Sequence, residues 1–181
     1  MYLRPAIASD LALLRRWDEQ LHVIAANAGD KRIWEVELSQ SPDWREQLIA
    51  EINGSPIGFI QIIDPAREES HYWGEITQGL RAIDIWIGEQ SNLGKGHGSA
   101  MMNLALARCF SVSEVSAVLV DPLVSNKRAH RFYERCGFRF VERRWFGADE
   151  CCVYRIRRGE FAPSSRQGAE ADGETTPGGT T

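Results

Sequence analysis

The sequence predicts a single mixed α/β domain, and three observations support that prediction. The chain has 181 residues, a length typical of one domain, and 43% of them are hydrophobic, which is enough to bury a core. Short runs rich in β-branched residues alternate with longer stretches whose apolar residues recur at helical spacing. A glycine-rich segment joins one such strand to one such helix. This alternation of strands and helices is typical of the mixed α/β class.

The individual elements follow from caps, turns and periodicity. Ser9 precedes a stretch with apolar residues at helical spacing, which predicts an early helix capped by that serine. A turn signal at 53–56 separates two antiparallel strands, 44–52 and 57–63. The remaining expectations, in chain order, are a strand at 81–87, a helix over 100–110, a strand at 117–120, a helix over 125–135 and closing strands near 138–146 and 151–157.

Composition and charge exclude several classes of protein. The net charge of −4 argues against nucleic-acid binding, which needs a basic face, and favours a cationic partner. No run approaches the roughly 18 apolar residues of a membrane span, and the first residues carry no secretory signal, so a cytoplasmic protein with no membrane role is expected. Residues 162–181 hold no aromatic or large aliphatic side chain. We therefore expect a folded domain over 1–161 followed by a disordered low-complexity tail.

The cysteines and histidines predict no disulfide framework and no metal centre. None of the cysteines shows C-x-x-C spacing, and Cys151 and Cys152 are neighbours that face opposite sides of a strand. Unpaired cysteines pack as small hydrophobic residues, so we expect buried free thiols. The histidines outside the glycine-rich segment lack metal-ligand spacing.

The glycine-rich segment predicts an anion site. Gly94, Gly96 and Gly98 allow backbone N–H groups to converge at a helix start, where the helix dipole favours a phosphate. The phosphate-binding motif of nucleoside triphosphatases, G-x-x-x-x-G-K-[ST], is absent. Five residues separate Gly88 from Gly94 where the motif has four, and Lys95 is followed by glycine where the motif has Ser or Thr. The dinucleotide motif fails because Met101 stands where its third glycine belongs. A loop that only turns the chain is the alternative.

A second motif lies about thirty residues downstream. Segment 121–138 contains N-x-x-A-x-x-x-Y-x-x-x-G-F, formed by Asn126, Ala129, Tyr133, Gly137 and Phe138. Together with the glycine loop, it resembles the GNAT superfamily of acyl-CoA-dependent N-acyltransferases. Over roughly residues 50–161 the chain also resembles the bacterial aminoglycoside 6′-N-acetyltransferases, through segments 72–75, 79–84, 93–96 and 121–129. Leu93, where the superfamily usually has Gln or Arg, is then a trait of that subfamily.

The resemblance implies a fold and a co-substrate. The fold is a central mixed, mostly antiparallel sheet flanked by helices, with the acyl-CoA loop between the fourth strand and the following helix. The co-substrate is acetyl-CoA, with no metal. The glycine loop would hold the pyrophosphate, Asn126 the pantetheine or phosphate arm, and Tyr133 would stand beside the thioester sulfur. The expected cofactor-binding set is Ile85, Trp86, Ile87, Leu93, Gly94, Lys95, Gly96, His97, Gly98, Ser99, Asn126, Arg128, Ala129 and Tyr133.

Acetyl transfer to an amine needs a base for the ammonium, a polarised carbonyl and a proton for the thiolate. Asp84 interrupts an apolar strand, where a carboxylate is costly unless it binds a cation or acts as a base; a solvent-facing Asp is the alternative. Tyr133 is the candidate acid, and a plain core tyrosine the alternative. Backbone N–H groups of 85–87 would stabilise the oxyanion if a bulge or Gly88 splays the strand.

The acceptor is expected to be cationic. Asp121 ends a strand just before a proline, at the edge where α/β sheets bind ligands, and the related enzymes use such an acid to grip a polycationic sugar. Glu75 and, with weaker support, Asp149 and Glu150 add to this. Trp73 and Trp86 either line the pocket or pack in the core. The expected substrate-binding set is Trp73, Glu75, Asp84 and Asp121.

The expected function is therefore an acetyl-CoA-dependent N-acetyltransferase of a small cationic amine, acting as a monomer or homodimer. The 6′-amine of aminoglycosides is the leading acceptor. A siderophore, polyamine or protein amine is the first alternative, and an inactive CoA-binding sensor domain is the second. Because one fold serves many acceptors, the reaction class is better supported than the acceptor.

Overall fold

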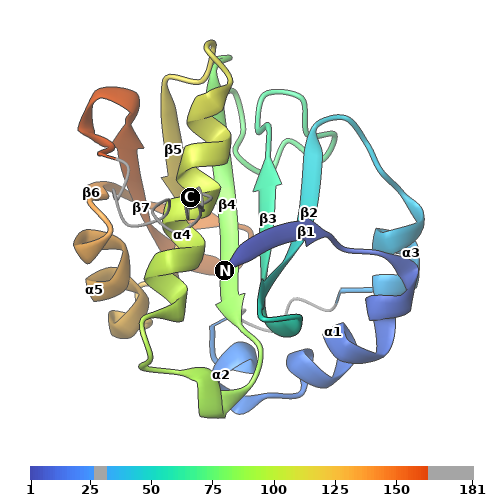
Figure 1. Ribbon diagram of the computed structural model, residues 1–181. Coiled ribbons are helices and arrows are strands. Elements are labelled where there is room, and N and C mark those ends of the chain that lie inside the picture. Colours follow the sequence, from blue (N-terminus) through green and yellow to red (C-terminus); the bar gives the residue numbers. More distant parts are fainter. Residues whose placement is uncertain (27–31, 163–181) are drawn as a thin grey trace, which may run out of the picture.

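The computed structural model describes residues 1–26 and 32–162, and its centre is one mixed sheet (Figure 1). The seven strands are β1 (Tyr2–Pro5), β2 (Arg45–Ile52), β3 (Ser55–Ile63), β4 (Leu80–Ile87), β5 (Ala117–Val120), β6 (Arg139–Phe146) and β7 (Asp149–Arg157). Their spatial order is β1-β2-β3-β4-β5-β7-β6, and among them β4 and β5 alone run parallel. The expected mostly antiparallel sheet is confirmed, with the glycine loop after the fourth strand.

In the described part of the chain, five α-helices flank the sheet: α1 (Leu11–Asp18), α2 (Leu21–Ile24), α3 (Trp34–Ser39), α4 (His97–Ser111) and α5 (Lys127–Arg135). The serine cap predicted for the early helix is wrong, because Ser9 lies inside a 3-10 turn and Asp10 holds the N-cap position of α1. At α5 the cap is Asn126, whose side-chain oxygen accepts a 3.0 Å hydrogen bond from the Ala129 amide. The elements missed by sequence periodicity are β1, α2 and α3, which have four to six residues each and are too short to show a period.

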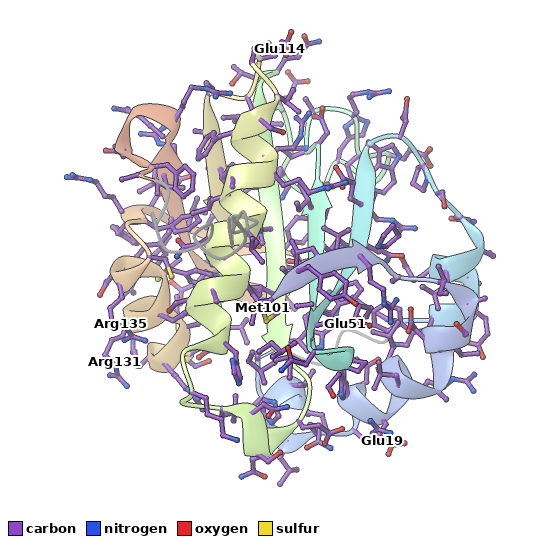
Figure 2. The ribbon with its side chains drawn as sticks, viewed as in Figure 1. Glu19, Glu51, Met101, Glu114, Arg131 and Arg135 are labelled. Carbon is purple, nitrogen blue, oxygen red and sulfur yellow. The ribbon has the colours of Figure 1, made fainter. Side chains whose placement is uncertain are left out.

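The two faces of the sheet bury different clusters. In Figure 1, α4 crosses in front of β4 with α5 beside it, and Figure 2 places Met101 between α4 and the sheet and the exposed Arg131 and Arg135 on the outer side of α5. On the opposite face, α1, α2 and α3 cover one apolar cluster: Leu14, Trp17, Val23, Trp34, Ile49, Phe59 and Trp86. A second cluster on that face is formed by Trp73, Ala82, Leu119, Phe146, Cys151 and Val153.

Strand alternation places Asp84 between these two clusters. Side chains of a strand alternate between its faces, so Ile83 and Ile85 pack toward α4 while Ala82, Asp84 and Trp86 point to the opposite face. Ala82 belongs to one apolar cluster of that face and Trp86 to the other. The carboxylate therefore lies where neither cluster fills the surface.

Strands β4 and β5 separate beyond their first residues. Their parallel pairing runs only from Leu80 to Ala82, whereas β4 continues to Ile87. Neither a bulge nor Gly88, the two conditions considered for freeing the amides of 85–87, splays β4 from β3. The register of β4 with β3 is regular through the pair Gly58–Ile87, and the Gly88 amide still donates to a β3 carbonyl at 2.9 Å. The gap arises from divergence of two strands rather than from irregularity within one.

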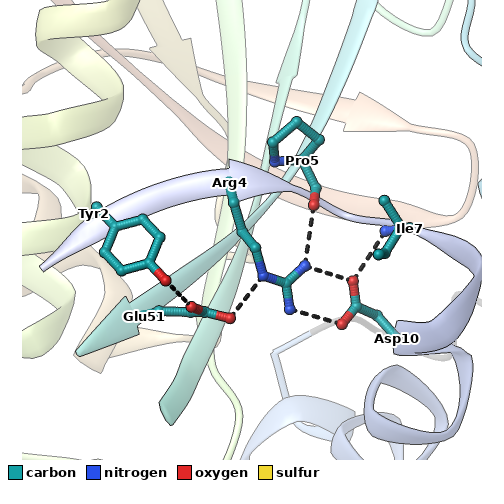
Figure 3. A network of polar contacts seen from close by, with 6 residues as sticks. All are labelled: Tyr2, Arg4, Pro5, Ile7, Asp10 and Glu51. Carbon is teal, nitrogen blue, oxygen red and sulfur yellow. Dashed lines mark hydrogen bonds and ion pairs between the residues drawn. The ribbon is translucent and has the colours of Figure 1, made fainter. Parts of the chain in front are cut away.

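A polar network secures the edge strand β1 to its neighbours (Figure 3). Arg4 donates to Glu51 through Nε at 2.6 Å and to both carboxylate oxygens of Asp10 at 2.7 and 2.8 Å. Tyr2 also donates to Glu51, and the Ile7 amide donates to Asp10 at 2.9 Å. Glu51 and Asp10 are both buried, and the shared guanidinium satisfies them.

The remaining expectations concern thiols, membrane and tail. The cysteines are free, three of them buried, and Cys151 and Cys152 belong to clusters on opposite faces of the sheet as predicted. No helix within the described ranges is long and apolar enough to cross a bilayer. The predicted tail lies, from residue 163 onward, outside the described residues, so the domain boundary stays a prediction.

Candidate active site

Two cavities open beside Asp84 and share it. One, of about 680 Å³, extends along the divergence of β4 and β5 toward the glycine loop and is called the cofactor cleft. The other, of about 460 Å³, lies between the two apolar clusters of the opposite face and is called the acceptor cavity. Asp84, Asp121 and Ala26 line both cavities. A molecule in one cavity can therefore reach a molecule in the other at these residues.

The glycine loop can hold a phosphate. Gly94 and Gly96 have φ values of +75° and +82°, a region that favours glycine, and a Cβ at either position would meet no atom within 4 Å. Gly96 is the N-cap of α4, a helix of 15 residues whose first N–H groups lack partners within the helix. Both glycines line the cofactor cleft, and amides without helical partners at the positive end of a helix dipole fit the pyrophosphate of coenzyme A.

The structure brings together nearly all of the predicted cofactor-binding residues. Thirteen of the fourteen line the cleft: Ile85, Trp86, Ile87, Leu93, Gly94, Gly96, His97, Gly98, Ser99, Asn126, Arg128, Ala129 and Tyr133. Lys95 is exposed on the loop and lines neither cavity. Sequence reasoning missed His22, Phe132 and Arg135, of which only the arginine, as a cation beside the predicted motif, carried a signal.

The free edge of β4 provides the donors expected for an oxyanion. Because the Gly88 amide points to β3 and strand amides alternate, the N–H groups of Ile85 and Ile87 point into the gap. The Ile87 carbonyl on the same edge accepts a hydrogen bond from His22 Nε2 at 2.8 Å. Backbone donors that lie in a cleft and point away from the sheet can stabilise the oxygen of a thioester as it becomes an anion.

Asp84 lies at the junction of the cavities, and one of its two carboxylate oxygens is contacted by neighbouring side chains. Its Oδ2 accepts a 2.9 Å hydrogen bond from Gln61 Nε2, and the guanidinium of Arg32 lies 3.6 Å away. Gln61 is the cross-strand neighbour of Asp84 on β3 and in turn accepts from Gln47 at 3.0 Å. These contacts fix the orientation of the carboxylate at a partly exposed position, where it can meet a cation.

Tyr133 lines the cofactor cleft from α5 and is buried. Burial raises the pKa of its phenol, and the charges of Asp84 and Asp121 raise it further. The hydroxyl therefore keeps its proton throughout the physiological pH range. That is the state a general acid needs before it donates to a leaving thiolate.

The acceptor cavity is rich in acids. Its lining includes five carboxylates, Glu37, Glu68, Asp84, Asp121 and Asp149, against two guanidinium groups, Arg32 and Arg45. Arg45 is ion-paired with Glu37. Although burial raises the pKa of Glu68, hydrogen bonds from Ser70 and from the Tyr72 amide outweigh it, so this carboxyl stays ionised. The local field favours a ligand with several positive charges.

Asp121 is positioned by an aromatic residue. Tyr72 donates a 2.7 Å hydrogen bond to its Oδ2, and the Tyr72 ring is stacked on Phe146 with centroids 4.5 Å apart. Cys151 lines the same wall, where burial raises the pKa of its thiol to about 12 with Asp121 and other acids contributing, so it remains neutral.

The predicted acceptor residues are partly brought together. Trp73, Asp84 and Asp121 line the acceptor cavity, and so does Asp149. Glu75 is exposed outside both cavities, and Glu150 instead lies 3.8 Å from Arg143. Among the lining residues missed by sequence reasoning, Arg32, Glu37 and Glu68 lie in loops or a short helix with no motif of their own, whereas Arg45 and Gln61 lie on β2 and β3. Within the described residues, no cluster of three or more His, Cys, Asp or Glu could hold a metal ion.

A glycine-rich loop after the fourth strand, a cleft between diverging strands and a tyrosine beside it are the arrangement expected of an acyl-CoA-dependent transferase. Residues 6–146 match the family described as acetyltransferase (GNAT) domain, and the chain belongs to this family. The match also covers residues 6–49, which precede the segment of about 50–161 that carries the resemblance in the sequence. The chain is an acetyl-CoA-dependent N-acetyltransferase.

Individual relatives are similar over most of the chain. An aminoglycoside N(6′)-acetyltransferase type 1 from Klebsiella pneumoniae is 32% identical over 145 residues, covering 75% of this chain and 72% of the relative. The solved structure of aminoglycoside acetyltransferase AAC(6′)-Ib with coenzyme A has a TM-score of 0.79 and 29% identity, covering 88% of this chain and 95% of that one. The complex of AAC(6′)-Ib with coenzyme A and kanamycin has the same TM-score and coverage at 28% identity.

Proposed function

We propose that the protein transfers the acetyl group of acetyl-CoA to the 6′-amine of aminoglycoside antibiotics and so confers resistance to them. The observation that carries the proposal is the acid-rich acceptor cavity that opens onto the cofactor cleft at Asp84. An aminoglycoside bears several ammonium groups on linked rings, and carboxylates distributed over one cavity match that charge. The relatives that bind coenzyme A with kanamycin, or are named for the 6′ position, support the same acceptor.

In the proposed reaction Asp84 receives the proton of the reacting ammonium, directly or through a water molecule. The neutral amine then attacks the thioester carbonyl, whose oxygen is stabilised by the N–H groups of Ile85 and Ile87. Tyr133 donates its proton to the departing sulfur as the C–S bond breaks. The nitrogen loses its second proton as the intermediate collapses, and this proton returns to the Tyr133 phenolate directly or through a water molecule. Asp84 releases the first proton to solvent, so both residues end in their starting states, and the products are the 6′-acetamide and free coenzyme A.

Asp121 and Glu68 contribute binding rather than chemistry in this proposal. Their carboxylates line the acceptor cavity, and each accepts a hydrogen bond from Tyr72, Asp121 from the hydroxyl and Glu68 from the backbone amide. They would take ammonium groups on rings other than the reacting one. The cytoplasm, which contains acetyl-CoA, is the proposed site of action.

The test is acetyl transfer by the full chain with acetyl-CoA and kanamycin, read as product mass. We expect a gain of one acetyl group on aminoglycosides with a 6′-amine and none on those with a 6′-hydroxyl. Spermidine, a siderophore hydroxylamine and a lysine peptide serve as alternative acceptors in the same assay. Transfer to one of these and not to kanamycin would replace the acceptor, whereas coenzyme A binding with no transfer to any amine would favour a sensor domain.

A further inference from the structure

Arg32 places a positive charge inside the acceptor cavity. Its side chain is only 16% exposed and lies just before α3, next to the junction of the two cavities. The other guanidinium of the cavity, that of Arg45, is ion-paired with Glu37. Among the described residues, Arg32 is therefore the cation paired with Asp84, the residue that an incoming ammonium group must also approach.

Two rings hold the Arg32 guanidinium in place. Its central carbon lies 4.6 Å from the ring centroid of Trp86 and 5.9 Å from that of Trp34. Trp86 is two residues from Asp84 on β4 and points to the same face, so stacking on this ring brings the guanidinium beside the carboxylate. The position of the cation is set by aromatic contacts as much as by charge.

The contact with Asp84 is an ion pair without a hydrogen bond. The nearest atoms, Arg32 Nη2 and Asp84 Oδ2, are 3.6 Å apart, beyond hydrogen-bond distance. The same oxygen already accepts a hydrogen bond from Gln61. A substrate ammonium group can therefore approach the carboxylate, but it meets a like charge there, and like charges sharing one counter-ion repel each other.

We propose that Arg32 is a specificity-determining residue, a resident counter-ion of Asp84 that competes with the acceptor's ammonium group and thereby raises the acceptor KM. This inference rests on the proposed function. It assigns Arg32 no proton transfer and no contact with acetyl-CoA. A polycationic acceptor overcomes the competition through Asp121, Glu68 and Asp149, whereas a monoamine has only Asp84 to bind.

The first experiment compares Arg32→Gln with the wild type. At saturating acetyl-CoA we expect the KM for kanamycin to fall about fivefold, the effect of an ion pair of about 1 kcal/mol. The KM for acetyl-CoA should stay unchanged. Arg32→Lys, which retains the charge, should keep a KM within about twofold of the wild type. Arg15→Gln is the matched control, because it removes an exposed guanidinium paired with Glu35 outside both cavities.

The second experiment is a double-mutant cycle read by calorimetry rather than by activity. The Kd for kanamycin is measured on the coenzyme A complex of the wild type, Arg32→Gln, Asp84→Asn and the double variant. If the competition takes place at Asp84, Arg32→Gln tightens binding in the wild type and has no effect once Asp84 is Asn. Coenzyme A affinity shows that each variant is folded.

The outcomes separate the two proposals. A KM and Kd for kanamycin that are unchanged or higher in Arg32→Gln would overturn the role of Arg32, and so would tighter binding that persists in the Asp84→Asn background. A wild type that acetylates no aminoglycoside would overturn the proposed function instead. Arg32→Lys with a KM as low as that of Arg32→Gln would also contradict the inference, because the charge is what competes.

Discussion

Tyr72 and Asp121, 49 residues apart in the chain, are joined by a 2.7 Å hydrogen bond at the wall of the acceptor cavity. The phenol belongs to the loop that precedes β4, and the carboxylate follows β5. Because β4 and β5 run parallel, the start of β4 and the end of β5 lie at opposite ends of the pair. The loop therefore reaches Asp121 by passing across the face of the sheet, where its Trp73 packs against Ala82 and Leu119. Tyr72, which binds no cation itself, thus positions Asp121, which is proposed to bind the acceptor.

Replacing Tyr72 by Phe should weaken acceptor binding. The variant keeps the stacking on Phe146 but removes one hydrogen bond that holds Asp121. We expect the KM for kanamycin to rise about fivefold with little change in kcat, as for loss of about 1 kcal/mol of ground-state interaction. Steady-state kinetics measures both constants. A lower kcat with an unchanged KM would instead assign Tyr72 to the chemical step.

Asp84→Asn should suppress the chemical step. The amide is similar in size and can still lie beside Gln61, but it cannot accept the proton of the ammonium. We expect kcat at neutral pH to fall by about 10²-fold to 10⁴-fold. If the carboxylate is the base, residual activity should recover at high pH, where the amine is neutral without its help. Asp149→Asn, in the same cavity but distant from the cofactor cleft, is the control for lost charge.

Tyr133→Phe should lower kcat without weakening acetyl-CoA binding. The phenyl ring fills the same buried space, whereas the proton for the departing sulfur is missing. A fall of about 10²-fold or more is expected when a general acid is removed. Pre-steady-state quench with mass detection measures the transfer itself. Unchanged turnover would mean that Tyr133 only packs in the core and is not the general acid.

Arg158→Ala should destabilise the fold while leaving the site intact. This side chain donates to four backbone carbonyls at the end of α4 and the segment that follows: Phe110, Val112, Val115 and Ser113. Carbonyls at a helix end have no partner within the helix, so we expect a loss of about 2 kcal/mol and a Tm lower by about 5 °C. Arg157→Ala, an exposed neighbour, is the control and should change Tm by less than about 1 °C.

The Arg4 network should make the free energy of unfolding depend on pH in the acidic range. Hydrogen bonds from Tyr2 and Arg4 lower the pKa of Glu51, and bonds from Arg4 and the Ile7 amide lower that of Asp10 despite its burial. Their folded pKa values lie below the unfolded ones of about 4, so the stabilisation is complete above about pH 5 and is lost as pH falls through the folded values.

The corresponding variant is Arg4→Met. It leaves two buried carboxylates without their cation, which should cost about 3 kcal/mol at pH 7. The midpoint of acid unfolding, followed by circular dichroism, should then move to higher pH. A midpoint that stays in place would show that the network is energetically neutral. Arg67→Met, which removes an exposed pair with Asp43, is the control.

Much of the fold could be predicted because it is encoded locally. The strand at 117–120 agrees with β5 residue for residue, and the strand over 81–87 differs from β4 by one residue. Elements β1, α2 and α3 were missed because four to six residues show no period. The cofactor cleft was also predictable, since its glycines and α5 motif are contiguous segments, and only Lys95 among its predicted members lies outside the cleft.

The acceptor cavity could not be predicted in the same way. Arg32 and Glu68, two of its missed residues, lie in loops, and the order of loops along the chain does not indicate which of them come into contact. Glu75 and Asp149 are both acids near predicted elements, yet only Asp149 lines the cavity. The difference depends on the path of each loop across the sheet.

By itself the sequence determined the strand and helix periods, the glycine loop, the tyrosine motif and the face of the strand on which Asp84 stands. These depend on interactions between residues close along the chain, where alternation and helical spacing leave few choices. Tertiary structure alone decided that β4 and β5 diverge, that two apolar clusters leave a polar gap between them, and that Tyr72 meets Asp121 and Arg32 meets Asp84. The register of distant strands and the packing of loops set those contacts, because only the folded chain brings their partners within a few ångströms.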